Sequence, residues 1–127
     1  MAGSVTVTTT ELPGGITKYS IAWLSDAIGA VSGNAVALKA GTQLQAGFTP
    51  DAAGTQPTDA YDATMTDTNG VDILGGTGAN LSNATATVAV PAVSTYFRRY
   101  LEAGNYTPVI ANAGNAKGGT IVLLVQS

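Results

Sequence analysis

The segment Ile16–Leu24 reads ITKYSIAWL, and its alternation decides the fold class. Tyr19, Ile21 and Trp23 occupy every second position, and successive side chains of a β-strand point to opposite faces of a sheet. We therefore predict a strand whose apolar face looks into a core. Trp23 is the one tryptophan of the chain, and we expect its large ring to anchor that core.

Similar short alternating segments recur along the chain, separated by turns rich in glycine, proline and aspartate. Residues 12–15 read LPGG, and residues 67–70 read DTNG, which is typical of a hairpin turn. We expect the arm that returns from the second turn to cover 71–74. Further strands are predicted at 5–10, 35–38, 43–48, 61–66 and 84–90.

The C-terminal part of the chain contains the most apolar segment. Residues 121–125 read IVLLV, which is apolar on both faces and predicts a central strand or one covered on both sides. Segments 106–112 and 120–126 flank a glycine-rich stretch, and we predict that they form a hairpin. Between 93 and 101 the spacing fits either a helix or a strand, and extended structure or a short turn is favoured because the surroundings are β.

Roughly eight to ten short strands, with a turn signal about every ten residues, are the pattern of a sandwich or a barrel. The chain has 127 residues, and its sequence contains no linker or internal repeat. We therefore predict a single all-β domain covering 1–127.

The composition removes most catalytic chemistry, because the chain has no histidine and no cysteine. Five basic residues and a net charge of −3 argue against a groove for nucleic acid. The apolar run at 121–125 is far shorter than the ~20 residues that span a bilayer, so no membrane partner is expected. The N-terminal residues MAGS show no secretion signal.

The low charge also bears on the surface. Charged residues make up 10% of this chain, whereas a small domain usually carries about 25%. A surface this poor in charge is a solubility risk for a free monomer. Two interpretations remain open: a neutral surface of threonine, serine and glycine, or a surface buried against copies of the chain or a larger assembly.

The basic residues cluster at one place, where Arg98 and Arg99 lie among aromatic residues. Arginine and tyrosine are common at the energetic centres of interfaces, so this segment is a candidate contact patch. Pairing of an arginine with an aspartate of the same chain is the alternative. The N-terminal strand is a second candidate, because an edge strand can pair with a neighbour. The predicted interface residues are Val5, Val7, Tyr96, Phe97, Arg98, Arg99 and Tyr100.

The aspartates raise two further possibilities. Residues 67–72 read DTNGVD, similar to the start of a calcium loop but without the downstream bidentate glutamate. A hairpin turn is favoured there, and a weak cation site stays open. Glycosidase chemistry would need a pair of carboxylates, and the candidates are Asp59, Asp62, Asp67 and Asp72. The preferred interpretation of these four residues is a solvated acidic face. We therefore predict no catalytic residue, no cofactor and no metal, and thus no enzyme.

Three stretches carry a family resemblance: 12–19 (LPGGITKY) with 23–26 (WLSD), 57–62 (PTDAYD) running into 67–72, and 111–120 (ANAGNAKGGT). In these patterns the chain resembles capsid decoration (cement) proteins of tailed bacteriophages. The resemblance implies a jelly-roll-like β-sandwich, with a β-tulip or small β-barrel as alternatives, that clamps major capsid protein subunits after head expansion. It also implies a homo-dimer or homo-trimer on the outer capsid surface of the virion, made in the host cytoplasm.

We therefore expect a structural virion protein that stabilises a capsid shell through many weak contacts. The alternative is a β-sandwich adhesion or carbohydrate-binding module of a phage tail or fibre. Exposed aromatic residues around a shallow groove, with acidic or amide neighbours, would mark such a module. The candidate aromatic residues are Tyr61, Tyr96, Tyr100 and Tyr106.

Overall fold

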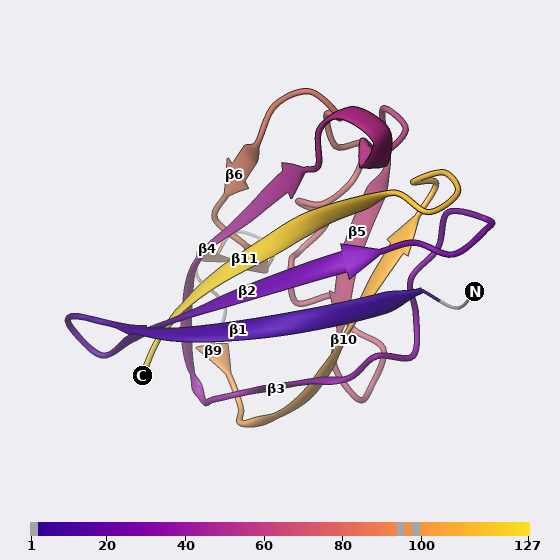
Figure 1. Cartoon of the computed structure of the whole chain (residues 1–127). Helices are drawn as coiled ribbons and strands as arrows, with labels where there is room; N and C mark the ends of the chain where they lie inside the picture. The colour runs from indigo at the N-terminus through magenta and orange to yellow at the C-terminus, as the bar shows by residue number, and fades with distance from the viewer. Residues whose placement is uncertain (1–2, 94–95, 98–99) are drawn as a thin grey trace.

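Two antiparallel sheets pack face to face in the computed structural model, which describes residues 3–93, 96–97 and 100–127 (Figure 1). The predicted all-β sandwich is confirmed. The larger sheet has the order β1 (Ser4–Leu12), β2 (Ile16–Leu24), β11 (Gly118–Gln126), β4 (Gly41–Pro50) and β6 (Thr87–Ala89), with β9 (Tyr100–Leu101) also paired to β4. Figure 1 shows β1 at the margin of this sheet and β11 between β2 and β4.

The smaller sheet has β10 (Gly104–Ala111) in the middle, between β3 (Val36–Leu38) and β5 (Asp62–Thr66). β7 (Ala92–Val93) and β8 (Tyr96–Phe97) form a separate short ladder, and η1 (Ala53–Thr55) is a single 3-10 turn. The segment in which helix and strand spacing competed is therefore extended at its described residues. Among the described residues, no helix has the length and apolar character needed to cross a membrane.

The core fills the space between the two sheets. Tyr19, Ile21 and Trp23 of β2 are buried, and the residues between them are half-buried or exposed. The alternation in the sequence therefore predicted the buried face correctly. Other members of the same core cluster include Ile121, Leu123, Val125, Phe48, Tyr61, Ala63, Met65 and Ile110.

β11 is a central strand, as predicted, because it pairs with β2 on one side and with β4 on the other. Its inner face is buried, whereas Val122 and Leu124 on the other face are half-buried. The apolar run thus belongs to a central strand with one open face.

Two predictions about strand pairing are wrong. β10 and β11 do not form a C-terminal hairpin, because β10 belongs to the smaller sheet and β11 to the larger one. The glycine-rich segment between them crosses the sandwich, so that both strands bury an apolar face in one core. The segment 71–74 is not a returning strand, because it makes one bridge to Thr66 and then enters consecutive turns that start at Asp72 and Leu74.

Trp23 contacts both sheets. It lies opposite Gly119 of β11, and a Cβ atom at Gly119 would lie 2.7 Å from Cζ2 of Trp23 and 2.9 Å from the Thr49 carbonyl oxygen. Glycine is therefore required for the indole to lie across β11. On its core side the Trp23 ring meets the Tyr61 ring at a centroid distance of 5.5 Å and an angle of 48°, a favourable tilted arrangement.

Tyr61 carries a hydroxyl group into this core. Burial raises the pKa of Tyr61 to about 12, and the negative charge of Asp51 acts in the same direction. The phenol is therefore neutral at physiological pH, which removes the desolvation cost of a buried charge.

Replacing Trp23 with alanine is expected to lower the free energy of unfolding by about 3–5 kcal/mol, because the change removes a large buried ring. Chemical denaturation followed by circular dichroism measures the loss. Val88→Ala is the control, since Val88 is 63% exposed, and it should change stability by less than about 0.5 kcal/mol. A loss below about 1 kcal/mol for Trp23→Ala would contradict its role in the core.

Candidate functional site

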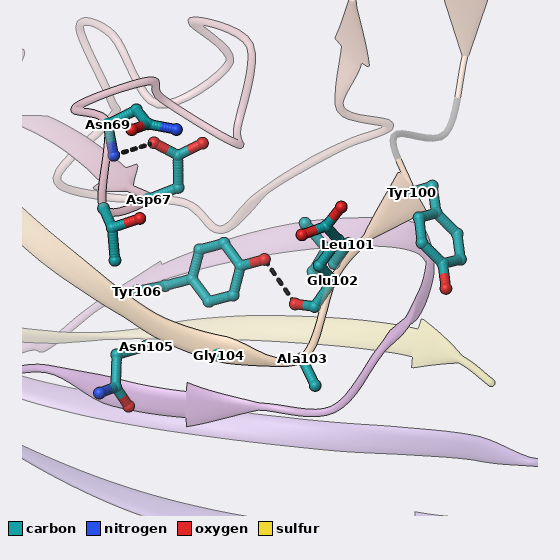
Figure 2. A pocket seen from close by; sticks show the side chains of 10 residues that line it. Asp67, Asn69, Tyr100, Leu101, Glu102, Ala103, Gly104, Asn105 and Tyr106 are labelled. Carbon is teal, nitrogen blue, oxygen red and sulfur yellow. Dashed lines mark hydrogen bonds between the residues drawn. The ribbon is translucent and has the colours of Figure 1, made fainter.

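A pocket lies between the turn after β5 and the segment that leads from β9 into β10 (Figure 2). Its volume is about 390 Å³, toward the lower end of the roughly 300–1,000 Å³ found for ligand sites. Segments 67–69 and 100–106 line it. This site joins two parts of the chain that the sequence analysis treated separately.

The pocket exists because β5 ends early. β10 pairs with β5 only from Thr107, which faces Thr66, whereas residues 104–106 of β10 pair with β3 on the opposite side. No described strand therefore occupies the β5 side of residues 104–106. The chain turns away at Asp67, and the space beside β10 becomes the pocket.

The turn at 67–70 forms one wall. Oδ1 of Asp67 accepts hydrogen bonds from the backbone N–H groups of Asn69 (2.9 Å) and Val71 (3.0 Å). The backbone closes the same turn, because the N–H of Gly70 donates to the carbonyl of Asp67 at 3.0 Å. Figure 2 shows the Asp67 carboxylate and the Asn69 amide together on this side of the pocket.

The opposite wall comes from the connection between β9 and β10. The Tyr106 hydroxyl donates a 2.7 Å hydrogen bond to the backbone carbonyl of Glu102 and so closes this connection (Figure 2). Tyr106 is buried, whereas Tyr100 is 64% exposed at the rim. The lining thus offers carboxylates that accept hydrogen bonds, an amide that donates and accepts, and an exposed aromatic ring.

Two of the four tyrosines predicted for a saccharide site meet here, because Tyr100 and Tyr106 both line the pocket. Tyr61 was the wrong candidate, since it is buried in the core against Trp23. Tyr96 lies in β8, outside the described lining of the pocket.

The predicted interface residues lie in separate parts of the fold. Val5 and Val7 of β1 are paired with Trp23 and Ile21 of β2. Because the side chains of paired residues lie on the same face of a sheet, both valines point to the inner side of the larger sheet. Val5 packs against the core. Tyr100 lies in β9, which β2, β11 and β4 separate from β1.

Other predicted interface residues follow β7. Tyr96 and Phe97 form β8, and Arg98 and Arg99 lie outside the described residues. The role of the two arginines therefore stays a prediction.

The side of the larger sheet that points away from the core is a surface that the sequence analysis did not single out. We call it the outer face. Its members occupy every second position along four long strands, with one further member in a short strand, and Lys18 is the charged member among them. They are Thr6, Thr8, Thr10, Lys18, Ser20, Ala22, Thr120, Val122, Leu124, Gln45, Gly47, Thr49 and Val88.

Gly47 lies near the middle of the outer face, opposite Val122 of β11 and Val88 of β6. A Cβ atom there would lie 3.8 Å from Cβ of Val122 and 3.9 Å from Cγ2 of Val88, which are ordinary contact distances. The backbone of Gly47 does not adopt a positive φ. Neither space nor backbone conformation therefore requires glycine at this position.

Asp59 is exposed and Asp62, Asp67 and Asp72 are half-buried, and the carboxylates of all four also accept hydrogen bonds from loops. Asp62 accepts hydrogen bonds from the backbone N–H of Asn80 (2.9 Å) and the side-chain amide of Asn112 (2.8 Å). Asp59 accepts one from the backbone N–H of Asn83 at 3.2 Å. These contacts tie loops that are distant in the sequence to the start of β5.

Asp72 makes the most extensive set of these contacts. Its Oδ1 accepts hydrogen bonds from the backbone N–H groups of Met65 and Leu74, and its Oδ2 accepts one from Gly76, each at 3.0 Å. Asp67 and Asp72, which begin and end the calcium-like sequence, thus serve backbone groups of their own loops. Within the described ranges, no group of three or more acidic residues is placed to hold a metal ion.

Asp72→Ala is expected to lower the free energy of unfolding by about 2–4 kcal/mol, because backbone N–H groups of buried residues lose a charged acceptor. Asp72→Asn keeps one acceptor oxygen and should lose less. Urea denaturation measures both variants beside Asp51→Ala, since Asp51 is exposed and its carboxylate accepts no described hydrogen bond. Equal stability of Asp72→Ala and Asp51→Ala would show that these hydrogen bonds do not stabilise the fold.

The chain matches no model of a known protein family, and a comparison with curated proteins finds no relative.

Proposed function

We propose that the chain is a structural virion protein, a capsid decoration protein that binds the outer surface of a major capsid protein shell and stabilises it. The observation that carries the proposal is the outer face, where Lys18 is the charged residue among many neutral ones. Charged residues are depleted in the cores of protein interfaces. A broad neutral face on a charge-poor protein is better suited to a contact than to water.

The chemistry of the outer face supports the same function. Val122, Leu124 and Val88 supply apolar area, and threonines on either side of them supply hydroxyl groups that donate and accept hydrogen bonds. A rigid sheet presents these groups in a fixed arrangement, which reduces the ordering cost of binding. Many copies on a closed shell then add weak contacts through avidity.

The resemblance to decoration proteins of tailed bacteriophages supports a capsid as the partner. Two of the segments that carry it, 67–72 and 111–120, form the turn after β5 and the connection from β10 to β11. We accordingly propose the outer capsid surface as the location and self-association as a homo-dimer or homo-trimer.

Val88→Lys is expected to weaken binding to the particle at least about tenfold, because it places an unpaired charge in the contact. Co-sedimentation with particles of the virus that encodes the chain, stripped of this protein, measures the affinity. Val71→Lys is the matched control, because Val71 is also exposed (47%) but lies in a turn away from the outer face. Equal binding of the two variants would exclude the outer face, and absence of the wild-type chain from purified particles would exclude the function.

A saccharide-binding module is a second candidate, and the pocket is the observation that favours it. Glu102 offers a carboxylate, Asn69 offers an amide, and Tyr100 offers an exposed ring at the rim. Sugar hydroxyl groups donate to carboxylates and accept from amides, and their apolar ring faces stack on aromatic side chains.

Titration with glucose, galactose and N-acetylglucosamine tests this second candidate. A pocket of this size is expected to bind a monosaccharide with a dissociation constant of order 1 mM. NMR shifts of the backbone amides at 67–69 and 100–106 should then saturate. Tyr100→Phe keeps the ring and should bind within about twofold of wild type, whereas Tyr100→Ala should lose about tenfold. Absence of saturable shifts with all three sugars would exclude the candidate.

A further inference from the structure

We infer that β1 is a self-pairing edge: two copies of this chain join antiparallel along β1 and merge their larger sheets across a two-fold axis. The inference rests on the self-association included in the proposed function, and it names the surface and the register. It concerns the free protein and does not require a capsid.

β1 is a long strand with one free side. Its 9 residues pair with β2 alone, so the backbone groups that point to the other side have no described strand partner. Residues 6–11 are all exposed. Figure 1 shows this strand along the margin of the sheet.

β1 lacks the features that normally protect an edge. Protected edges are short, bulged, or carry proline or lysine. β1 reads SVTVTTTEL, without proline or lysine, and its register with β2 has no shift. By contrast, β3 and β6 have 3 residues each and β5 has 5. Among the described strands at the margins of the two sheets, β1 alone is both long and regular.

A second copy of β1 fits this edge in sequence. When two identical strands pair antiparallel, the two-fold axis passes through one residue and its copy. Full overlap of Ser4–Leu12 places Thr8 opposite Thr8 of the second copy, Thr6 opposite Thr10, and Val7 opposite Thr9. These are pairs of β-branched residues, which pack well across neighbouring strands. The exposed Val7 side chain gains cover in this arrangement.

The same register brings no like charges together. Glu11 is the charged residue of β1, and it faces Val5 of the second copy. The two Glu11 carboxylates lie six positions apart along the ladder, about 20 Å, which exceeds the screening length of ~8–10 Å. Each Glu11 also keeps its own cation, because Nζ of Lys39 lies 2.9 Å from its Oε1.

The pairing is expected to be weak in free solution. One strand pair buries less than a standard interface of about 1,600 Å², so we expect a dissociation constant of roughly 10 µM to 1 mM. On a particle, neighbouring copies would be held at a higher effective concentration.

A charge-swap experiment tests the surface and the register together. Sedimentation velocity of the full chain, from about 10 µM to 2 mM, compares wild type with Thr8→Lys and Thr8→Asp. Each variant places two like-charged side chains directly opposite each other at the axis, with their Cβ atoms about 5 Å apart, and should raise the dimer dissociation constant at least about fivefold. An equimolar mixture should restore the dimer, because lysine then faces aspartate.

Thr49→Lys is the matched control, because Thr49 is an exposed threonine of the outer face in β4, which β2 and β11 separate from β1. It should associate as wild type does. If a Thr8 variant fails to fold by circular dichroism, a mixture of Thr6→Lys and Thr10→Asp applies the same test, and a preference for the mixed dimer is expected.

A wild-type chain that stays monomeric at the highest concentration, or that forms a trimer, overturns the inference. A dimer that the Thr8 variants leave unchanged also overturns it, because the contact then lies elsewhere while self-association stands. Capsid binding is read separately from Val88→Lys, so failure of this inference and failure of the proposed function give different results.

Discussion

The packing of Trp23 across Gly119 is the contact on which the rest of the sandwich depends. It fixes the register of β2 against β11, because a slip of one residue would turn the indole to the outer face. β11 also pairs with β4 on its other side, so the position of β11 in turn determines how β4 is aligned. Through Tyr61 the same indole reaches the start of β5 and therefore the smaller sheet. The Trp23 ring, together with the space left by Gly119, thus aligns both sheets.

Carboxylates hold the connections that the core does not reach. A chain without cysteine has no disulfides, and long loops leave backbone N–H groups that need acceptors. Asp26 accepts from Ile28 and Ala30, both at 2.9 Å, in the same way that Asp67 and Asp72 serve the turns after β5. Hydrogen bonds to a charged acceptor are stronger than those between neutral groups. The aspartates therefore act as structural anchors, and this explains why they cluster in the sequence where the loops are long.

Local alternation predicted the buried face of β2, and the apolar run at 121–125 predicted the central place of β11, because both depend on residues close in sequence. It failed for the C-terminal pair, since a glycine-rich connection fits a hairpin and a crossing between sheets equally well. The pocket depends on where β5 stops relative to β10, which only strand pairing determines. The outer face combines five strands that are distant in the sequence. A usable signal did exist, because the residues between the buried positions of 16–24 and 120–126 include one charge, Lys18.

The distribution of charge connects the loops to the surface. The chain has 8 acidic and 5 basic residues, and most described ones serve its own structure. Several aspartates bind loop N–H groups, Glu11 pairs with Lys39, and Lys117 donates to the Gly54 carbonyl at 3.1 Å. Because most of the charged side chains serve the loops, the strands between the loops carry few charges. The outer face and the β1 edge therefore have little charge repulsion to oppose association. A protein built in this way places its charges at its turns and leaves its sheets largely neutral, and the capsid contact and the β1 pairing that we propose both rest on that distribution.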